Sequence, residues 1–147
     1  MTSIRSSQVN ITPSGVRRLG YVVSIALSAG LLYVVNNLLE WNAAPFITED
    51  YEQILPILNA VLIAIMIVNA IWILYDAAWM RSVGRIILNL TVIGAVALTL
   101  KVFPFSFAAY TFNWEALVTF VMVFLILGLV VTTIIEIVKL GGKLANG

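Results

Sequence analysis

The sequence predicts an all-α membrane protein built as a bundle of four transmembrane helices. Of its 147 residues, 62% are hydrophobic and only 10% are charged, so a soluble domain of this size would have too little polar surface to cover its exterior. A helix needs about 20 apolar residues to cross the roughly 30 Å hydrocarbon core of a bilayer. Four apolar runs have this length, and they are residues 19–39, 55–74, 83–102 and 117–138.

The basic residues predict which side of the membrane each end of the chain occupies. If the chain starts in the cytoplasm, the inner side holds Arg5, Arg17, Arg18, Arg81, Arg85, Lys139 and Lys143, and only Lys101 falls on the outer half. The positive-inside rule then places both termini in the cytoplasm. We therefore expect a cytoplasmic segment at residues 1–18, a transmembrane domain at residues 19–140 and a cytoplasmic tail at residues 141–147, in a plasma or inner membrane.

Local signals predict where the helices begin and end. Thr12 before Pro13, and Thr48 before two carboxylates, are typical of helix N-caps. Asn113 before Glu115 repeats this arrangement ahead of the fourth span. Gly141 and Gly142 are expected to end the fourth helix.

A short repeat favours an architecture of two tandem helical hairpins. Pro45 and Phe46, with Tyr51 six residues after the proline, recur as Pro104 and Phe105 with Tyr110. Each set follows an outward span and precedes its return. Only three residues match in a chain rich in Phe, so duplication and coincidence both remain open.

Amides within the spans are the candidate interhelical polar contacts. Asn69 and Asn89 lie on the inner halves of the second and third spans and are predicted to meet. Asn36 and Asn37, at the outer end of the first span, are predicted to meet Asn59. Such contacts join helices at about 0.6 kcal/mol each, and the alternative is that the amides line a polar path for a ligand or ion.

The second outer loop is unusually aromatic and is a candidate docking surface. Its rings belong to Phe103, Phe105, Phe107, Tyr110, Phe112 and Trp114. The alternatives are that the loop lies on the membrane surface or caps the bundle. Aromatic residues near other span ends, among them Tyr51 and Trp72, are expected to anchor at the lipid headgroups.

Two missing residue types exclude several kinds of chemistry. Without Cys there is no disulfide, thiolate nucleophile or thiolate-bound metal, and without His there is no imidazole for haem ligation or a Ser-His relay. The net charge of +1 argues against nucleic acid as a partner. No carboxylate lies at mid-membrane, which argues against a proton-coupled carrier. We expect no catalytic, cofactor-binding or metal-binding residues.

Three functions remain open. The favoured one is a non-catalytic structural or interaction subunit whose apolar faces self-associate or pack against a membrane partner. Faces of small residues allow close helix approach, either within the chain's own bundle or in an oligomer contact, and they are Ser24 and Ser28, Ala26 and Gly30, and Ala60 and Ala64. The first alternative is a small transporter or channel formed on oligomerisation. The second is a lipid-directed enzyme using Glu49, Asp50 and Glu52, although these carboxylates also fit a charged helix start. Glu136 and Lys139 are expected to pair along the fourth helix.

Overall fold

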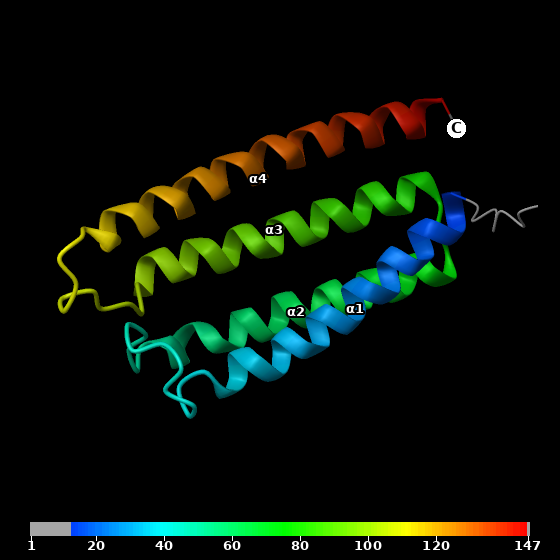
Figure 1. The fold of residues 1–147 in the computed structure, drawn as a ribbon. Coiled ribbons are helices and arrows are strands. Elements are labelled where there is room, and N and C mark those ends of the chain that lie inside the picture. Colours follow the sequence, from blue (N-terminus) through cyan, green and yellow to red (C-terminus); the bar gives the residue numbers. More distant parts are fainter. Residues whose placement is uncertain (1–12, 147) are drawn as a thin grey trace, which may run out of the picture.

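The computed structural model describes residues 13–146 and consists of four helices (Figure 1). Their bounds are α1 Pro13–Asn37, α2 Tyr51–Leu74, α3 Ala78–Val102 and α4 Trp114–Ala145. All four are long and apolar enough to cross a membrane, so the predicted all-α fold with four spans is confirmed. Arg5 and the expected cap at Thr12 lie outside the described residues.

The helices pack in series. Contacts join α1 to α2, α2 to α3 and α3 to α4, whereas within residues 13–146 helices α1 and α4 do not meet. Figure 1 shows α1 crossing α2 on one side of the array and α4 lying against α3 on the other. The fold is therefore an open bundle made of two hairpins joined through α2 and α3. We call the end where α1 begins and α4 finishes the terminal end, and the end with residues 38–50 and 103–113 the loop end.

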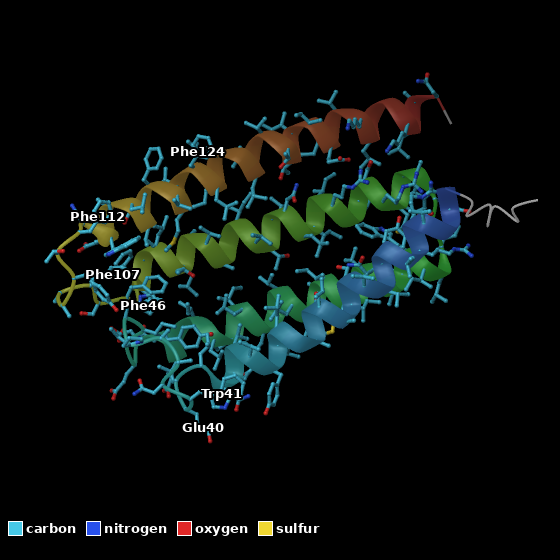
Figure 2. All side chains as sticks on the ribbon, viewed as in Figure 1. Glu40, Trp41, Phe46, Phe107, Phe112 and Phe124 are labelled. Atoms are coloured by element: carbon cyan, nitrogen blue, oxygen red, sulfur yellow. The ribbon has the colours of Figure 1, made fainter. Side chains whose placement is uncertain are left out.

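Burial follows from this order, because α2 and α3 have neighbours on two sides while α1 and α4 have one each. Helix α2 supplies most of the buried apolar side chains, which are Tyr51, Ile54, Val61, Leu62, Val68 and Trp72, and α3 adds Ala95. The edge helices expose many large apolar side chains, such as Leu27 on α1 and Phe124 on α4. Figure 2 shows Phe124 pointing away from the other helices. Hydrocarbon tails solvate such side chains without penalty, so an open bundle is stable in a bilayer.

Trp72 holds three helices together at the terminal end. Its ring lies 5.3 Å from the ring of Tyr21 on α1, and its Nε1 donates to the Met80 carbonyl of α3 at 3.3 Å. A Cβ placed on Gly84 of α3 would lie 2.6 Å from the Trp72 ring. The expectation that Trp72 and Tyr51 anchor at the headgroups was wrong, since they are only 8% and 5% exposed and pack inside the protein.

Three of the predicted helix ends lie within residues 13–146, and two of these three predictions are wrong. The Asn113 side chain does cap α4, accepting from the Ala116 N–H at 3.1 Å. Thr48 does not cap α2, because its buried hydroxyl has no hydrogen-bond partner. Its backbone N–H instead joins the two loops by donating to the Pro104 carbonyl at 2.9 Å. The helix begins instead after Asp50, whose carboxylate accepts from the Gln53 side chain at 3.0 Å.

Gly141 and Gly142 do not end α4, which continues to Ala145. Lys143 accounts for the extra turn, because its Nζ donates to the Ser82 hydroxyl at 2.7 Å and to the Ala78 carbonyl at 3.2 Å. These contacts with α3 oppose the cost of about 1 kcal/mol for each helical glycine.

Candidate functional site

A row of polar side chains runs between α3 and α4 in the terminal half of the array. We call it the polar seam, and it consists of Ser82, Arg85 and Asn89 on α3 with Thr132, Glu136 and Lys143 on α4. Arg85 Nη1 donates to Glu136 Oε1 at 3.2 Å, and Asn89 Nδ2 donates to Thr132 Oγ1 at 3.4 Å. Lys143 completes the row at Ser82. The side chains recur every three, four or seven residues, so each helix presents them on one face.

Glu136 is the most constrained ionisable group of the polar seam. The residue is 8% exposed, and its Oε2 is buried without a hydrogen-bond partner. Its ion pair is with Arg85 across the helix interface, so the expected pairing with Lys139 on the same helix was wrong. The two side chains point in different directions, since Glu136 faces α3 while Lys139 lies on the exposed side of α4.

The polar seam stops at about mid-depth. Asn89 lies 11 residues beyond the first residue of α3, about 17 Å along its axis. Toward the loop end, the next half-buried side chains on this face of α4 are Leu129, Ile126 and Met122, which are apolar and separate the polar seam from Thr119. The polar seam therefore does not continue to the loop end and forms no polar path along the full contact between α3 and α4.

A second polar cluster joins α1 to the connection between α2 and α3. Asp76, whose side chain is 8% exposed, accepts from Arg81 Nη1 at 2.7 Å, Arg17 Nε at 3.0 Å and the Tyr21 hydroxyl at 3.1 Å. The Arg81 guanidinium contributes most, followed by Arg17 and Tyr21, and together they lower the pKa of Asp76 from 3.8 to about 2 against the opposing effect of burial. Asp76 therefore links α1 to α3 through its ion pairs with Arg17 and Arg81, and we call this link the Asp76 staple.

The candidate amides form one of their two predicted pairs. Asn36 and Asn59 exchange hydrogen bonds of 2.7 and 3.2 Å between α1 and α2. Asn37 does not join them, because its amide donates to the Tyr33 carbonyl of its own helix at 2.7 Å.

The pairing of Asn69 with Asn89 was wrong. Asn69 is 4% exposed and donates to the Ile65 carbonyl of its own helix at 2.7 Å. Asn89 turns toward α4 and contacts Thr132. The two amides lie on α2 and α3, but α3 has a neighbour on either side, and the position of Asn89 falls on the face toward α4.

The aromatic loop caps the loop end by packing against the first loop. Thr48 N–H donates to the Pro104 carbonyl at 2.9 Å, and Ser106 N–H donates to the Phe46 carbonyl at 2.7 Å. The Phe46 ring stacks on Phe107 at 5.6 Å and lies 6.3 Å from Phe105 (Figure 2). Three of the six candidate docking residues, Phe103, Phe105 and Phe107, are thus half-buried within the chain's own cap.

The other three candidates remain exposed, and two of them, Tyr110 and Trp114, line a pocket. Phe112, Tyr110 and Trp114 are 58%, 43% and 41% exposed. Between the cap and the start of α4 lies a pocket of about 320 Å³, which we call the aromatic pocket and which is lined by Phe46, Phe107, Tyr110, Trp114 and Val118.

The two proline motifs of the suggested repeat differ in conformation. Tyr51 begins α2, is buried and donates its hydroxyl to the Val35 carbonyl at 2.9 Å. Tyr110 lies in the loop four residues before α4 and is exposed. Pro104 is fully buried, whereas Pro45 is exposed. The two hairpins are present, but their connecting loops are not equivalent.

The carboxylates at the start of α2 do not gather around a common point. Among residues 13–146, no three acidic side chains are placed to hold a metal ion together. Asp50 is the residue preceding the first turn of α2, and Glu52 lies within that turn. Glu49, Asp50 and Glu52 thus form a charged helix start, where carboxylates interact favourably with the helix dipole.

The polar seam and the Asp76 staple were not predicted from the sequence. A usable signal exists for the polar seam, because Ser82, Arg85 and Asn89 are spaced as one helix face, as are Thr132, Glu136 and Lys143. Asp76 gives a weaker signal, since a lone carboxylate between two spans is compatible with many partners.

No protein-family model, curated protein or solved structure matches the chain. The features that bear on its function are the polar seam, the Asp76 staple, the two edge helices with one neighbour each, and the aromatic pocket.

Proposed function

We propose that this small membrane protein is a non-catalytic subunit that self-associates through its edge helices α1 and α4. The observation that carries the proposal is the serial packing, because α1 and α4 each contact one neighbour and do not contact each other. A second copy turned by a two-fold axis along the membrane normal would bring each α1 against the partner's α4 and close both open sides.

Small residues on the exposed faces support such a contact. A Cβ built on Gly30 of α1 or on Gly128 of α4 would meet no atom within 4 Å. Gly30 lies 17 residues after Pro13, and Gly128 lies 17 residues before Ala145, which is about 26 Å from the terminal end in both helices. Glycine at matched depths allows two helix backbones to approach closely in a bilayer.

The charge distribution supports an orientation with the terminal end in the cytoplasm of a plasma or inner membrane. Among the described residues, six basic side chains lie at that end, and they are Arg17, Arg18, Arg81, Arg85, Lys139 and Lys143. Lys101, near the end of α3, is the basic residue at the loop end. This bias is the arrangement that the positive-inside rule describes.

Disulfide cross-linking in membranes tests the self-association directly, since the natural chain has no Cys. The double variant Gly30→Cys/Gly128→Cys should form covalent dimers on mild oxidation, because a disulfide requires two Cα atoms within about 7 Å. The matched control Val22→Cys/Gly128→Cys moves one thiol about 12 Å along α1. Val22 is also exposed, and this control should stay monomeric.

The outcomes distinguish what covers the exposed faces of α1 and α4. Dimers of the first variant alone support a second copy packed at matched depth. Cross-links to a different membrane protein would contradict self-association and indicate a heterologous partner. Monomers throughout, at native expression level, would mean that lipid covers α1 and α4, and the proposal would be wrong.

A further inference from the structure

We propose that the aromatic pocket binds a lipophilic organic cation, a free quaternary ammonium or phosphonium compound with apolar substituents. Four of the five residues that line the pocket are aromatic, and the fifth is Val118. Its volume of about 320 Å³ falls in the roughly 300–1,000 Å³ range of small-molecule sites. This inference is independent of the proposed self-association.

A second hollow next to the aromatic pocket supplies a carboxylate. This hollow, of about 410 Å³, shares Phe107, Tyr110 and Trp114 with the aromatic pocket and is also lined by Asn113 and Glu115. Glu115 is the one acidic residue in either lining, and no basic residue lines them. Among the ion pairs of residues 13–146, none involves Glu115. The two hollows together fit a molecule with an apolar body and a positive centre.

The aromatic rings of the pocket and the negative charge of the loop end both favour a positively charged ligand. A cation over the face of Trp, Tyr or Phe is attracted by the ring quadrupole, most strongly by Trp. The loop end also has an excess of negative charge, because it carries Glu40, Glu49, Asp50, Glu52 and Glu115 against Lys101. This excess raises the local concentration of cations and repels anions. A neutral apolar molecule would fill the aromatic pocket without gaining from either effect.

Binding of tetraphenylphosphonium to the full chain, measured by equilibrium dialysis in a neutral detergent, tests the proposal. The cation should bind saturably, and tetraphenylborate, an anion of the same shape, should bind far more weakly. Glu115→Gln and Trp114→Leu should each weaken binding of the cation roughly threefold to tenfold. Glu40→Gln and Trp41→Leu are matched controls that change an exposed carboxylate and an exposed Trp away from the aromatic pocket (Figure 2), and each should weaken binding far less than the corresponding pocket variant.

Each contrary result overturns the proposal. Equal binding of tetraphenylborate would show an apolar pocket with no preference for cations. Unchanged affinity in both pocket variants, with helicity confirmed by circular dichroism, would place the cation elsewhere, and the absence of saturable binding would remove the site. If nanodiscs of phosphatidylcholine suppressed binding relative to nanodiscs of phosphatidylethanolamine, the occupant would be a lipid choline headgroup and not a free cation.

Discussion

Gly84 sets the distance between α2 and α3. A methyl group at this position would lie 2.6 Å from the Trp72 ring and 2.8 Å from Val68 Cγ1, which is closer than nonbonded carbon atoms approach. Trp72 cannot easily move aside, because it also contacts Tyr21 and the Met80 carbonyl. The junction of α1, α2 and α3 therefore requires glycine at position 84, because there is no room for a side chain there.

Gly84→Ala should lower the free energy of unfolding by about 1–3 kcal/mol, the usual penalty for overpacking a filled contact. The measurement is denaturant or thermal unfolding of the purified protein in detergent. Gly94→Ala is the control in the same helix, since a Cβ there meets no atom within 4 Å, and its stability should be unchanged or slightly increased. Equal effects of the two substitutions would mean that helix propensity, and not the Trp72 contact, determines the change in the free energy of unfolding.

The sequence predicts which side chains are unusual better than it predicts their partners. Asn36 and Asn59 were paired correctly because they lie at the same depth in consecutive antiparallel spans and face each other. Asn69 and Asn89 also lie at the same depth in consecutive spans, but they do not face each other. Their partners depend on the rotation of each helix about its axis, which is set by packing elsewhere, such as the close contact at Gly84.

Helix α4 is held to the rest of the protein by one narrow stripe of side chains that faces α3. Its half of the polar seam carries two charged groups, Glu136 and Lys143, which both bond to α3. Their spacing was visible in the sequence, but the spacing alone does not say whether α3, another helix or lipid headgroups receive them. The Asp76 staple has the corresponding role for α1, which is also linked to α2 near the loop end by the amide pair and by the hydrogen bond from the Tyr51 hydroxyl to the Val35 carbonyl.

The Asp76 staple predicts a loss of stability at low pH. The pKa of Asp76 is lowered from 3.8 to about 2 in the folded protein, so the folded state favours the ionised carboxylate. Its contribution is fully present above about pH 4 and is lost as the pH falls toward 2. Asp76→Asn should lower the melting temperature at pH 7 and flatten the decline between pH 4 and pH 2. Asp50→Asn, which removes a carboxylate outside these ion pairs, should leave that decline intact.

The number and approximate ranges of the spans followed from the length of the hydrophobic runs, because the bilayer fixes how much apolar chain each crossing needs. The order of packing did not follow. Lipid and protein are equally apolar surroundings for residues such as Leu27 and Phe124, so no pattern of apolar residues distinguishes an open array from a closed one. The pairing of the two long loops was hidden for a related reason, since it uses backbone groups of Phe46, Thr48, Pro104 and Ser106.

The orientation of the array is testable with single cysteines in the natural Cys-free background. Asp50→Cys and Ser106→Cys lie at the loop end, and Tyr75→Cys and Asn146→Cys lie at the terminal end, all at exposed positions. An impermeant maleimide applied to intact cells should label only the first two, because the basic residues favour a cytoplasmic terminal end. Permeabilised cells should show labelling at all four sites, which confirms that each thiol is accessible. Labelling of Tyr75→Cys in intact cells, with Ser106→Cys protected, would invert the array and place the aromatic pocket in the cytoplasm.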